Sequence, residues 1–276
     1  MKRERNIKVH RKRFGYKYLL FTFLFILILF LIFLLIKNIF MPEKVIFESV
    51  SHDSEISKME KKYNNSDYDV IGWIDVAGTN LNMPILRAIH ESGDYPVTME
   101  KYAWSLSDKK KYYNFMAIFG HNLMNLGVPK KSDSSFKRFE ELMSFIYEDF
   151  AKEHKYFQYT INGKTYVYKI FSVDIDYAST IYEFPKHGAS KDEMKSLIKE
   201  FKDNSIYKYN DDVNDDDDIL VLTTCTRLFA EEGYYDMLVA GKRIESNEKA
   251  TDYSFTKTEK YKKIEKILKG DDIYEK

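Results

Sequence analysis

The single cysteine of this 276-residue chain, Cys225, closes an apolar run of β-prone residues, Ile219–Thr224. An unpaired thiol acts either as a small buried side chain or as a nucleophile. It becomes nucleophilic when a neighbouring base, most often a histidine, generates or stabilises the thiolate. The run predicts a buried strand that delivers Cys225 to the rim of a sheet.

One of the six histidines is presented in the same way. His121 follows the apolar run Phe115–Phe119 and Gly120, whereas the others lie in polar or charged surroundings. Two strands ending in Cys225 and His121 at one rim would form a catalytic dyad. An imidazole, whose pKa is ordinarily about 6.5, suits the role of general acid and base. The alternative is a structural histidine and an inert thiol.

Short runs separated by turn residues fill the part of the chain that must position this dyad. Strands are predicted at Val70–Val76, Met83–Leu86, Phe115–Phe119, Tyr156–Ile161, Thr165–Val173, Ile219–Thr224 and Tyr235–Ala240. We expect Met83–Leu86 to be an edge strand or extended segment, because Pro84 cannot donate to a ladder. Seven or eight short strands with few helices favour a closed or nearly closed β-barrel over a parallel doubly wound sheet.

Helices are predicted between these strands and near the C-terminus. Aromatic spacing of three to four residues predicts helix over Phe136–Met143 and Ser144–Lys152, and Ser190–Phe201 is amphipathic. Residues 245–276 are rich in charged residues and tyrosine. We expect them to form a mobile tail with a helix near Thr256–Lys269.

The N-terminus combines a basic arm with an apolar run. The formal net charge of the chain is zero, but residues 1–17 carry eight Lys or Arg against one Glu. Residues 19–36 are apolar except for Thr22, about the length that crosses a bilayer. This predicts a cytoplasmic arm at 1–17, an uncleaved transmembrane signal anchor at 18–37 and an extracellular remainder. We then expect the basic arm at 1–17 to lie at a membrane and not to bind a nucleic acid.

Residues 38–68 form a predicted linker with an N-terminal helix that leads from the anchor to a catalytic domain at 69–244. In an extracytoplasmic domain cysteines normally occur in pairs, so the lone Cys225 is either without a role or a working thiol. The charged segment 245–276 follows this domain.

Six of the eight residues at 211–218 are aspartate. Oxygen-rich clusters suit calcium, but the glycine and the closing glutamate of an EF-hand loop are missing. We interpret the run as a solvated acidic loop and expect no required cofactor. A calcium site is the alternative, with the ligands Asp215, Asp216, Asp217 and Asp218.

Together, these residues resemble the sortases, membrane-anchored cysteine transpeptidases of Gram-positive surfaces. The family signature T-L-x-T-C is matched by Val221–Cys225, with valine in first position, and the family G-H motif by Gly120–Asn122. Class B looks most similar because of the anchor, the opening Ile71–Ile74 and a long helix before the cysteine strand, here Ser190–Tyr209. The resemblance covers about Asp69–Ile244 and implies a closed sortase-type barrel of about eight strands with peripheral helices.

The resemblance implies a two-step acyl transfer. Cys225 attacks the carbonyl after a threonine in the C-terminal sorting signal of a surface protein, giving a thioester that an amine of a peptidoglycan precursor or a pilin then resolves. His121 protonates the leaving amine and deprotonates the incoming one. The implied substrate contacts are Thr223, Thr224, Asn122 and Tyr235.

One departure concerns the arginine that the family places on the last strand, roughly eight to ten residues after the cysteine. Gly233–Asp236 occupies this region of the sequence. Asp236 takes the arginine's place, and a carboxylate there repels an oxyanion. Losing such a donor costs about 100- to 1000-fold in rate. Arg227, two residues past Cys225, is the nearest cation in the sequence, and we assign it the arginine's role as a hypothesis.

Two other interpretations remain. The missing arginine suggests a catalytically weak or silent sortase-fold protein that binds sorting signals or pilins. An unrelated cell-wall cysteine peptidase would usually place its cysteine at a helix N-terminus, which the strand-like run Ile219–Thr224 argues against.

Overall fold

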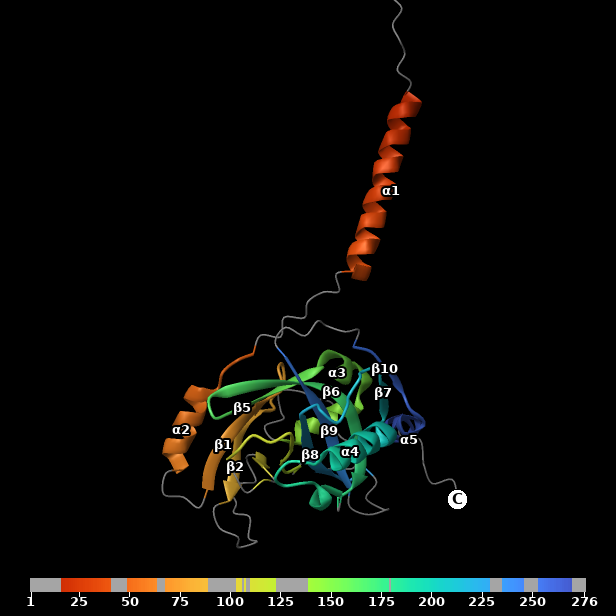
Figure 1. Cartoon of the computed structure of the whole chain (residues 1–276). Coiled ribbons are helices and arrows are strands. Elements are labelled where there is room, and N and C mark those ends of the chain that lie inside the picture. The colour runs from red at the N-terminus through yellow and green to blue at the C-terminus, as the bar shows by residue number, and fades with distance from the viewer. Residues whose placement is uncertain are drawn as a thin grey trace, which may run out of the picture. The chain divides into compact units, whose positions relative to one another are not determined.

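A β-barrel forms the centre of the fold in the computed structural model (Figure 1). The described residues are 16–40, 49–63, 68–88, 103–105, 107, 110–122, 139–178, 180–228, 235–245 and 253–269. The chain divides into two compact units, and the barrel lies in the larger one, which includes Ile46–Glu248.

The smaller unit contains α1 (Tyr16–Phe40), a helix of mostly Leu, Ile and Phe. Among the residues described, no helix has the combination of length and hydropathy that a membrane span requires. The transmembrane anchor at 18–37 stays a prediction.

Eight strands of the described chain close the barrel in the order β1-β2-β3-β4-β8-β9-β6-β5, which confirms the predicted closed barrel. The β2–β3 and β4–β8 pairs are parallel and the other pairs antiparallel. The strands are β1 (Tyr68–Asp75), β2 (Asn82–Ala88), β3 (Ala103–Ser105), β4 (Phe115–Phe119), β5 (Tyr156–Ile161), β6 (Lys164–Tyr177), β8 (Ile219–Thr226) and β9 (Tyr235–Ile244).

The predicted edge segment Met83–Leu86 lies within β2, which pairs with β1 on one side and β3 on the other. The edge expectation is wrong because closure leaves the barrel without a free edge there. Pro84 is tolerated because β3 pairs only with Ile85 and Leu86, so the proline lies beyond the β2–β3 ladder.

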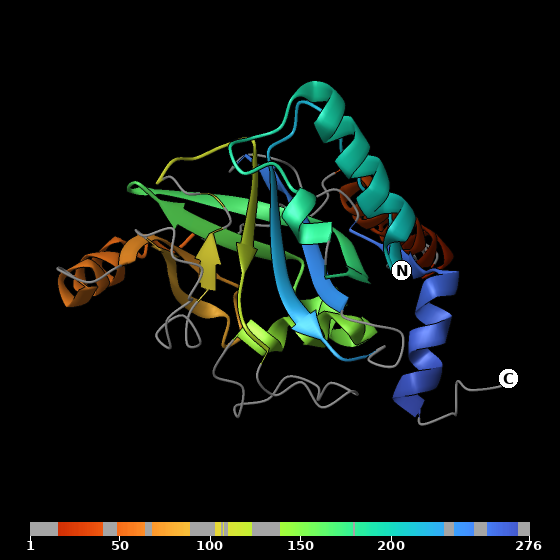
Figure 2. The ribbon, with the colours of Figure 1, turned by 90° about the horizontal axis from the view of Figure 1, so that it is seen from below.

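Alternate residues of the central strands belong to two apolar clusters. Leu222 and Met237 belong to a cluster with members from strands all around the barrel, so this cluster fills the barrel interior. Val221 and Leu238 join a second cluster on the outer face, which Met194 of α4 (Lys191–Asn204) helps to cover (Figure 2). Burial on both faces explains why the predicted strands are continuously apolar instead of alternating.

The predicted helical segment at 136–152 differs from the structure. Residues 136–138 lie outside the described residues, and the remainder forms a 3₁₀ helix, η2 (Phe139–Ile146), followed by α3 (Glu148–Glu153). All eight residues of η2 are buried, and Tyr147 is extended between the two helices. Packing on every side of η2 therefore determines its 3₁₀ form, although the aromatic spacing of the sequence favours an α-helix.

The helix α4 begins as predicted at Ser190, which forms a capping box with Glu193. It ends at Asn204 and does not continue to Tyr209. The Ser205 hydroxyl donates to the carbonyl of Val173 (3.1 Å) and so fixes the end of the helix against β6. The chain then continues into β7 (Tyr207–Tyr209).

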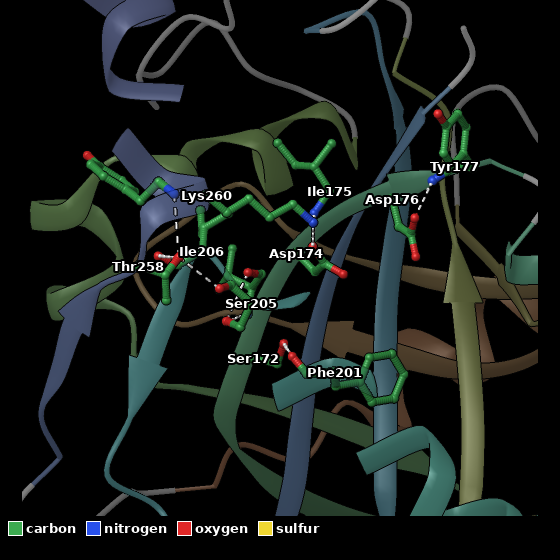
Figure 3. Close-up of polar contacts among 12 residues, drawn as sticks. Ser172, Asp174, Ile175, Asp176, Tyr177, Phe201, Ser205, Ile206, Thr258 and Lys260 are labelled. Carbon is green, nitrogen blue, oxygen red and sulfur yellow. Dashed lines mark hydrogen bonds and ion pairs between the residues drawn. The ribbon is translucent and has the colours of Figure 1, made fainter. Parts of the chain in front are cut away.

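The C-terminal segment contains the expected helix, α5 (Glu259–Lys269), but it is docked and not a mobile tail over its described length. Its strand β10 (Phe255–Lys257) pairs with β7. Figure 3 shows Lys260 paired with Asp174 of β6 and Thr258 donating to the Ser205 carbonyl (3.0 Å). The described part of the chain also contains the helices α2 (Asp53–Tyr63) and η3 (Thr180–Glu183).

Candidate active site

The C-terminal ends of β4 and β8 lie side by side because these strands are parallel neighbours. Phe119 is aligned with Thr223, and the amide of Gly120 donates to the Thr223 carbonyl at 3.0 Å. Continuing this register by two residues places His121 beside Cys225. The structure therefore brings together the backbone segments that carry the two residues singled out by the sequence.

Two side chains fasten these strand ends to each other. The Thr224 hydroxyl donates to the Gly120 carbonyl (2.5 Å), and the Asn122 amide donates to the Cys225 carbonyl (2.8 Å). Thr223 and Thr224 are fully buried. Thr224 and Asn122 thus use their hydrogen-bonding groups within the protein, where they hold the loop after β4 against the cysteine strand.

Gly120 is required by the packing below this loop. A Cβ atom at this position would lie 2.2 Å from Cγ of Phe139, the first residue of η2. No side chain fits at that distance, so only glycine lets β4 reach the rim and present His121.

The imidazole of His121 lies against two aromatic rings. Its ring centroid is 4.8 Å from that of Trp104 and 6.0 Å from that of Phe119, both in edge-on geometry. Trp104 belongs to the short strand β3 and is buried. Sequence reasoning missed this residue because a three-residue strand carries almost no periodic signal.

Cys225 is half-buried in β8, where its neighbours Thr224 and Thr226 are fully enclosed. Burial raises the pKa of its thiol to about 12, and the nearby carboxylate of Asp236 adds to this shift. A thiol in this state is protonated at neutral pH, so the site must supply a base before Cys225 can act as a nucleophile.

Asp236 lies directly opposite Cys225 in the antiparallel β8–β9 ladder. Its carboxylate is 1% exposed, and burial raises its pKa to about 7. The position that the sequence assigned to the missing arginine therefore holds a buried acid that faces the thiol.

The remaining predicted site residues lie around this pair. Arg227 follows the end of β8, and its side chain is exposed. Tyr235 begins β9, is buried, and stacks on Tyr177 at a centroid distance of 4.7 Å.

The acidic run before β8 is neutralised by basic side chains. Asp216 pairs with Lys191 (2.6 Å) and Asp218 with Arg243 (2.9 Å), while Asp217 accepts from the amide of Asn214 (2.9 Å). In the part of the chain that is described, no three His, Cys, Asp or Glu converge as metal ligands. The need for a cofactor stays untested.

Another histidine has a role that the sequence did not reveal. His52, which lies in the predicted linker, is buried just before α2, with Nε2 3.1 Å from a carboxylate oxygen of Asp75. Gln158 donates to the same oxygen (2.9 Å), and Trp73 stacks on the imidazole at 5.4 Å. This cluster fastens α2 to β1 and β5.

Comparison with known proteins decides the family. The sortase domain model matches residues 74–244. The chain belongs to the sortase family. It is 28% identical to sortase B of Listeria monocytogenes over 185 residues, covering 64% of this chain and 70% of that protein. It is 20% identical to Staphylococcus aureus sortase B, covering 65% and 72%.

Solved sortase structures share the fold. Clostridium perfringens sortase B superposes with a TM-score of 0.54 at 24% identity, covering 68% of this chain and all of that one. The Staphylococcus aureus sortase B–substrate complex gives 0.53 at 19% identity, covering 70% and 85%. This protein is a class B-like sortase, and its general activity is cysteine transpeptidation.

Proposed function

We propose that this sortase cleaves a C-terminal sorting signal after threonine through a thioester on Cys225, and transfers the surface protein to a cell-wall or pilin amine. The observation that carries the proposal is the parallel β4–β8 junction, which aligns His121 with Cys225 and is fastened by the Gly120 and Asn122 hydrogen bonds. Sortase B has been solved with substrate and, separately, with triglycine, which supports a peptide donor and an amine acceptor.

In the first step, the thiol proton of Cys225 passes to His121 and the sulfur forms a bond to the carbonyl carbon. The carbon–nitrogen bond then breaks, and His121 returns its proton to the leaving amine. In the second step, His121 takes a proton from the incoming amine, whose nitrogen replaces the sulfur on the carbonyl carbon. The thiol is regenerated, so the chemistry is that of a thiol peptidase with an amine in place of water.

The aromatic contacts of His121 and the strand fastening serve this proton transfer. Trp104 and Phe119 fix the imidazole plane, and Thr224 fixes the backbone from which it projects. We assign Arg227 to substrate or oxyanion binding from the loop after β8. Thr223 and Tyr235 are buried, so we assign them to the support of the strand ends and not to substrate contact. If Arg227→Ala keeps full transpeptidation, that assignment fails.

We further propose that α1 anchors the chain in the membrane with its N-terminus in the cytoplasm and the catalytic domain outside. The basic residues 1–17 and the apolar run behind them support this. Expression of the full chain and of a variant lacking residues 1–40, followed by cell fractionation, tests it. Equal distribution of the two in soluble fractions would contradict an anchor.

The test of the activity uses the full chain in detergent with a panel of sorting-signal peptides and an amine acceptor. Mass spectrometry should find a thioester adduct on Cys225 that is absent from Cys225→Ala and strongly reduced in His121→Ala, because the first step already needs the histidine as base and acid. Because Asp236 replaces the arginine, a protein that only binds sorting signals is the second candidate. It would bind these peptides and give no adduct while its thiol still reacts with a small alkylating reagent.

A further inference from the structure

Asp236 faces the reacting thiol and has no role in the mechanism above. Directly opposite residues of an antiparallel pair project from the same face, with Cβ atoms about 4.5–5.5 Å apart. Asp236 and Cys225 form such a pair. Both carboxylate oxygens of Asp236 are buried, and neither accepts a conventional hydrogen bond from any described residue. Buried polar groups of this kind are rare and call for an explanation.

The elements around Asp236 provide no neutralising cation among the described residues. Burial dominates the pKa of its carboxyl, and the thiol is the one described group that lowers it. On β6 the residue directly opposite is another acid, Asp176, whose carboxylate accepts from the amide of Tyr177 (2.8 Å; Figure 3). The titratable side chains directly opposite Asp236 in the sheet are Cys225 on β8 and Asp176 on β6. Glu200 (α4) interacts with Asp176 and with Glu183 (η3), so that side of the site adds only acids. Arg227 follows the end of β8 and His121 follows β4, and neither lowers the pKa of Asp236.

A carboxylate in such a place takes up a proton instead of remaining charged. Burial accordingly raises the pKa of Asp236 to about 7. The protonated form carries an O–H donor, which the ionised form lacks. The ionised form has the opposite effect, because it accepts the S–H of Cys225 and keeps the sulfur protonated.

We propose that Asp236 works in its protonated form, as a neutral hydrogen-bond donor first to the Cys225 thiolate and then to the oxyanion that develops beside it, in the place of the arginine. This inference rests on the proposed acyl transfer at Cys225. A neutral acid donates one hydrogen bond and carries no charge, so it supports the reaction only while it keeps its proton. Ionisation of Asp236 switches the site off.

Counting protons turns this into a pH signature. The active form holds a thiolate on Cys225, a proton on His121 and a proton on Asp236. When the site loses one more proton, the stable arrangement is an ionised Asp236 that binds the S–H of Cys225. Because the three groups titrate together, kcat/KM should fall about tenfold per pH unit above an apparent pKa near that of Asp236.

The decisive variant is Asp236→Asn in the full chain, because the amide keeps a donor in the same shape and cannot ionise. We expect wild-type kcat/KM to decline above about pH 7 and the variant to stay level for at least about one further pH unit. Asp176→Asn, on the neighbouring strand, is the matched control and should keep the wild-type decline. An identical decline in wild type and Asp236→Asn overturns the proposal.

A second variant separates donation from shape. Asp236→Leu fills the position without a donor, and we expect about a 100-fold lower kcat/KM at the wild-type optimum, the loss typical of a missing oxyanion donor. Asp236→Asn should remain within about tenfold of wild type there. Thermal melting verifies that both variants are folded. Equal activity of a folded Leu variant and the Asn variant overturns the proposal.

Alkylation of the single cysteine by iodoacetamide measures the same coupling without a peptide. We expect Asp236→Asn to be alkylated about tenfold faster than wild type at pH 8–9, because the neighbouring charge that opposes the thiolate is gone. Equal rates overturn the Asp236 proposal whatever the peptide assays show. Faster alkylation of the variant with no thioester from any peptide supports the coupling and rejects the proposed function.

Discussion

The imidazole of His121 depends on aromatic side chains for its orientation. Trp104 contacts it edge-on from β3, a strand that pairs with β4 and so carries the tryptophan to the rim. A displacement of about 1 Å at a reacting group costs up to about 100-fold in rate. Trp104 therefore acts through His121, as a positioning residue.

Trp104→Ala should lower kcat/KM by about 10- to 100-fold and slow alkylation of Cys225 by a smaller factor, because alkylation needs His121 only as a base and not as the acid for a leaving amine. Peptide turnover and iodoacetamide alkylation measure the two effects. Trp73→Ala is the matched control, since Trp73 stacks in the same way on His52, a buried histidine away from Cys225, at 5.4 Å. Equal losses of activity in the two variants would show that Trp104 acts only through stability.

The raised pKa of Asp236 also predicts how stability responds to pH. The folded protein keeps this proton up to about pH 7, whereas an unfolded aspartate loses it near pH 3.9. Between these values the folded state binds more protons, so the free energy of unfolding falls as pH rises. Asp174, whose pKa burial raises to about 6 despite its pairing with Lys260, acts in the same direction.

We therefore expect Asp236→Asn to raise the melting temperature at pH 8. At this pH the wild-type protein carries a buried carboxylate, whose ionisation lowers the free energy of unfolding by an amount on the order of a few kcal/mol. At about pH 3 the two proteins should melt within about 1 °C of each other, since the acid is then almost fully protonated in the folded and in the unfolded state. Calorimetry at the two pH values provides the measurement. A gain of equal size at both would assign the effect to packing instead of ionisation.

At the scale of elements, the β4–β8 junction is the part of the site that the sequence predicted well. Continuous apolar runs that stop at Gly120 and Cys225 indicate buried strands and the residues at their ends. The partners across the sheet were harder to predict. Trp104 lies on a strand of only three residues, which is too short for a sequence pattern. The burial of Asp236 depends on the neighbouring strand β6 and on other segments that are distant in the sequence, so no local pattern predicts it.

Two wrong predictions have a common physical cause, which is tertiary packing that the local sequence does not reveal. The Phe136–Lys152 helix prediction rested on an amphipathic period, but η2 is buried on every side, so tertiary packing sets its 3₁₀ form. The prediction of a mobile tail followed from the high charge of residues 245–276. Two residues of α5, Tyr261 and Ile264, are nevertheless buried in the core cluster and hold the helix against the rest of the fold.

Gly120→Ala tests the junction as a unit. The added methyl group would meet Phe139 at 2.2 Å, so β4 or η2 must shift, and overpacking of this kind costs about 1–3 kcal/mol. We expect a matching loss in urea-unfolding stability together with about a 100-fold lower kcat/KM, because His121 moves with the strand end. Gly163→Ala serves as control: its φ is +71°, but no atom lies within 4 Å of the added Cβ.

Gly163→Ala should lose roughly 1 kcal/mol through backbone strain and keep its activity, because the β5–β6 turn lies outside the site. Full activity in Gly120→Ala would show that the close approach to Phe139 relaxes without moving His121.

At the scale of the whole catalytic unit, the C-terminal segment completes the core. Tyr261 and Ile264 of α5 are buried in the cluster that fills the barrel, next to Tyr207 of β7, and Lys260 reaches Asp174 on β6. The family model ends at residue 244, so this segment lies beyond the matched domain. Its packing makes it part of the same folding unit.

Ile264→Ala should therefore destabilise the barrel itself by about 2–5 kcal/mol, the cost of removing a fully buried isoleucine side chain. Lys263→Ala, exposed one residue earlier on the same helix, should change stability by less than about 0.5 kcal/mol. Urea unfolding followed by the fluorescence of Trp73 and Trp104, which lie on β1 and β3, reports on the barrel and not on α5. If Ile264→Ala leaves that transition in place, α5 folds as an appendage. A lower midpoint with a single transition would mean that the catalytic barrel depends on a segment outside its family domain.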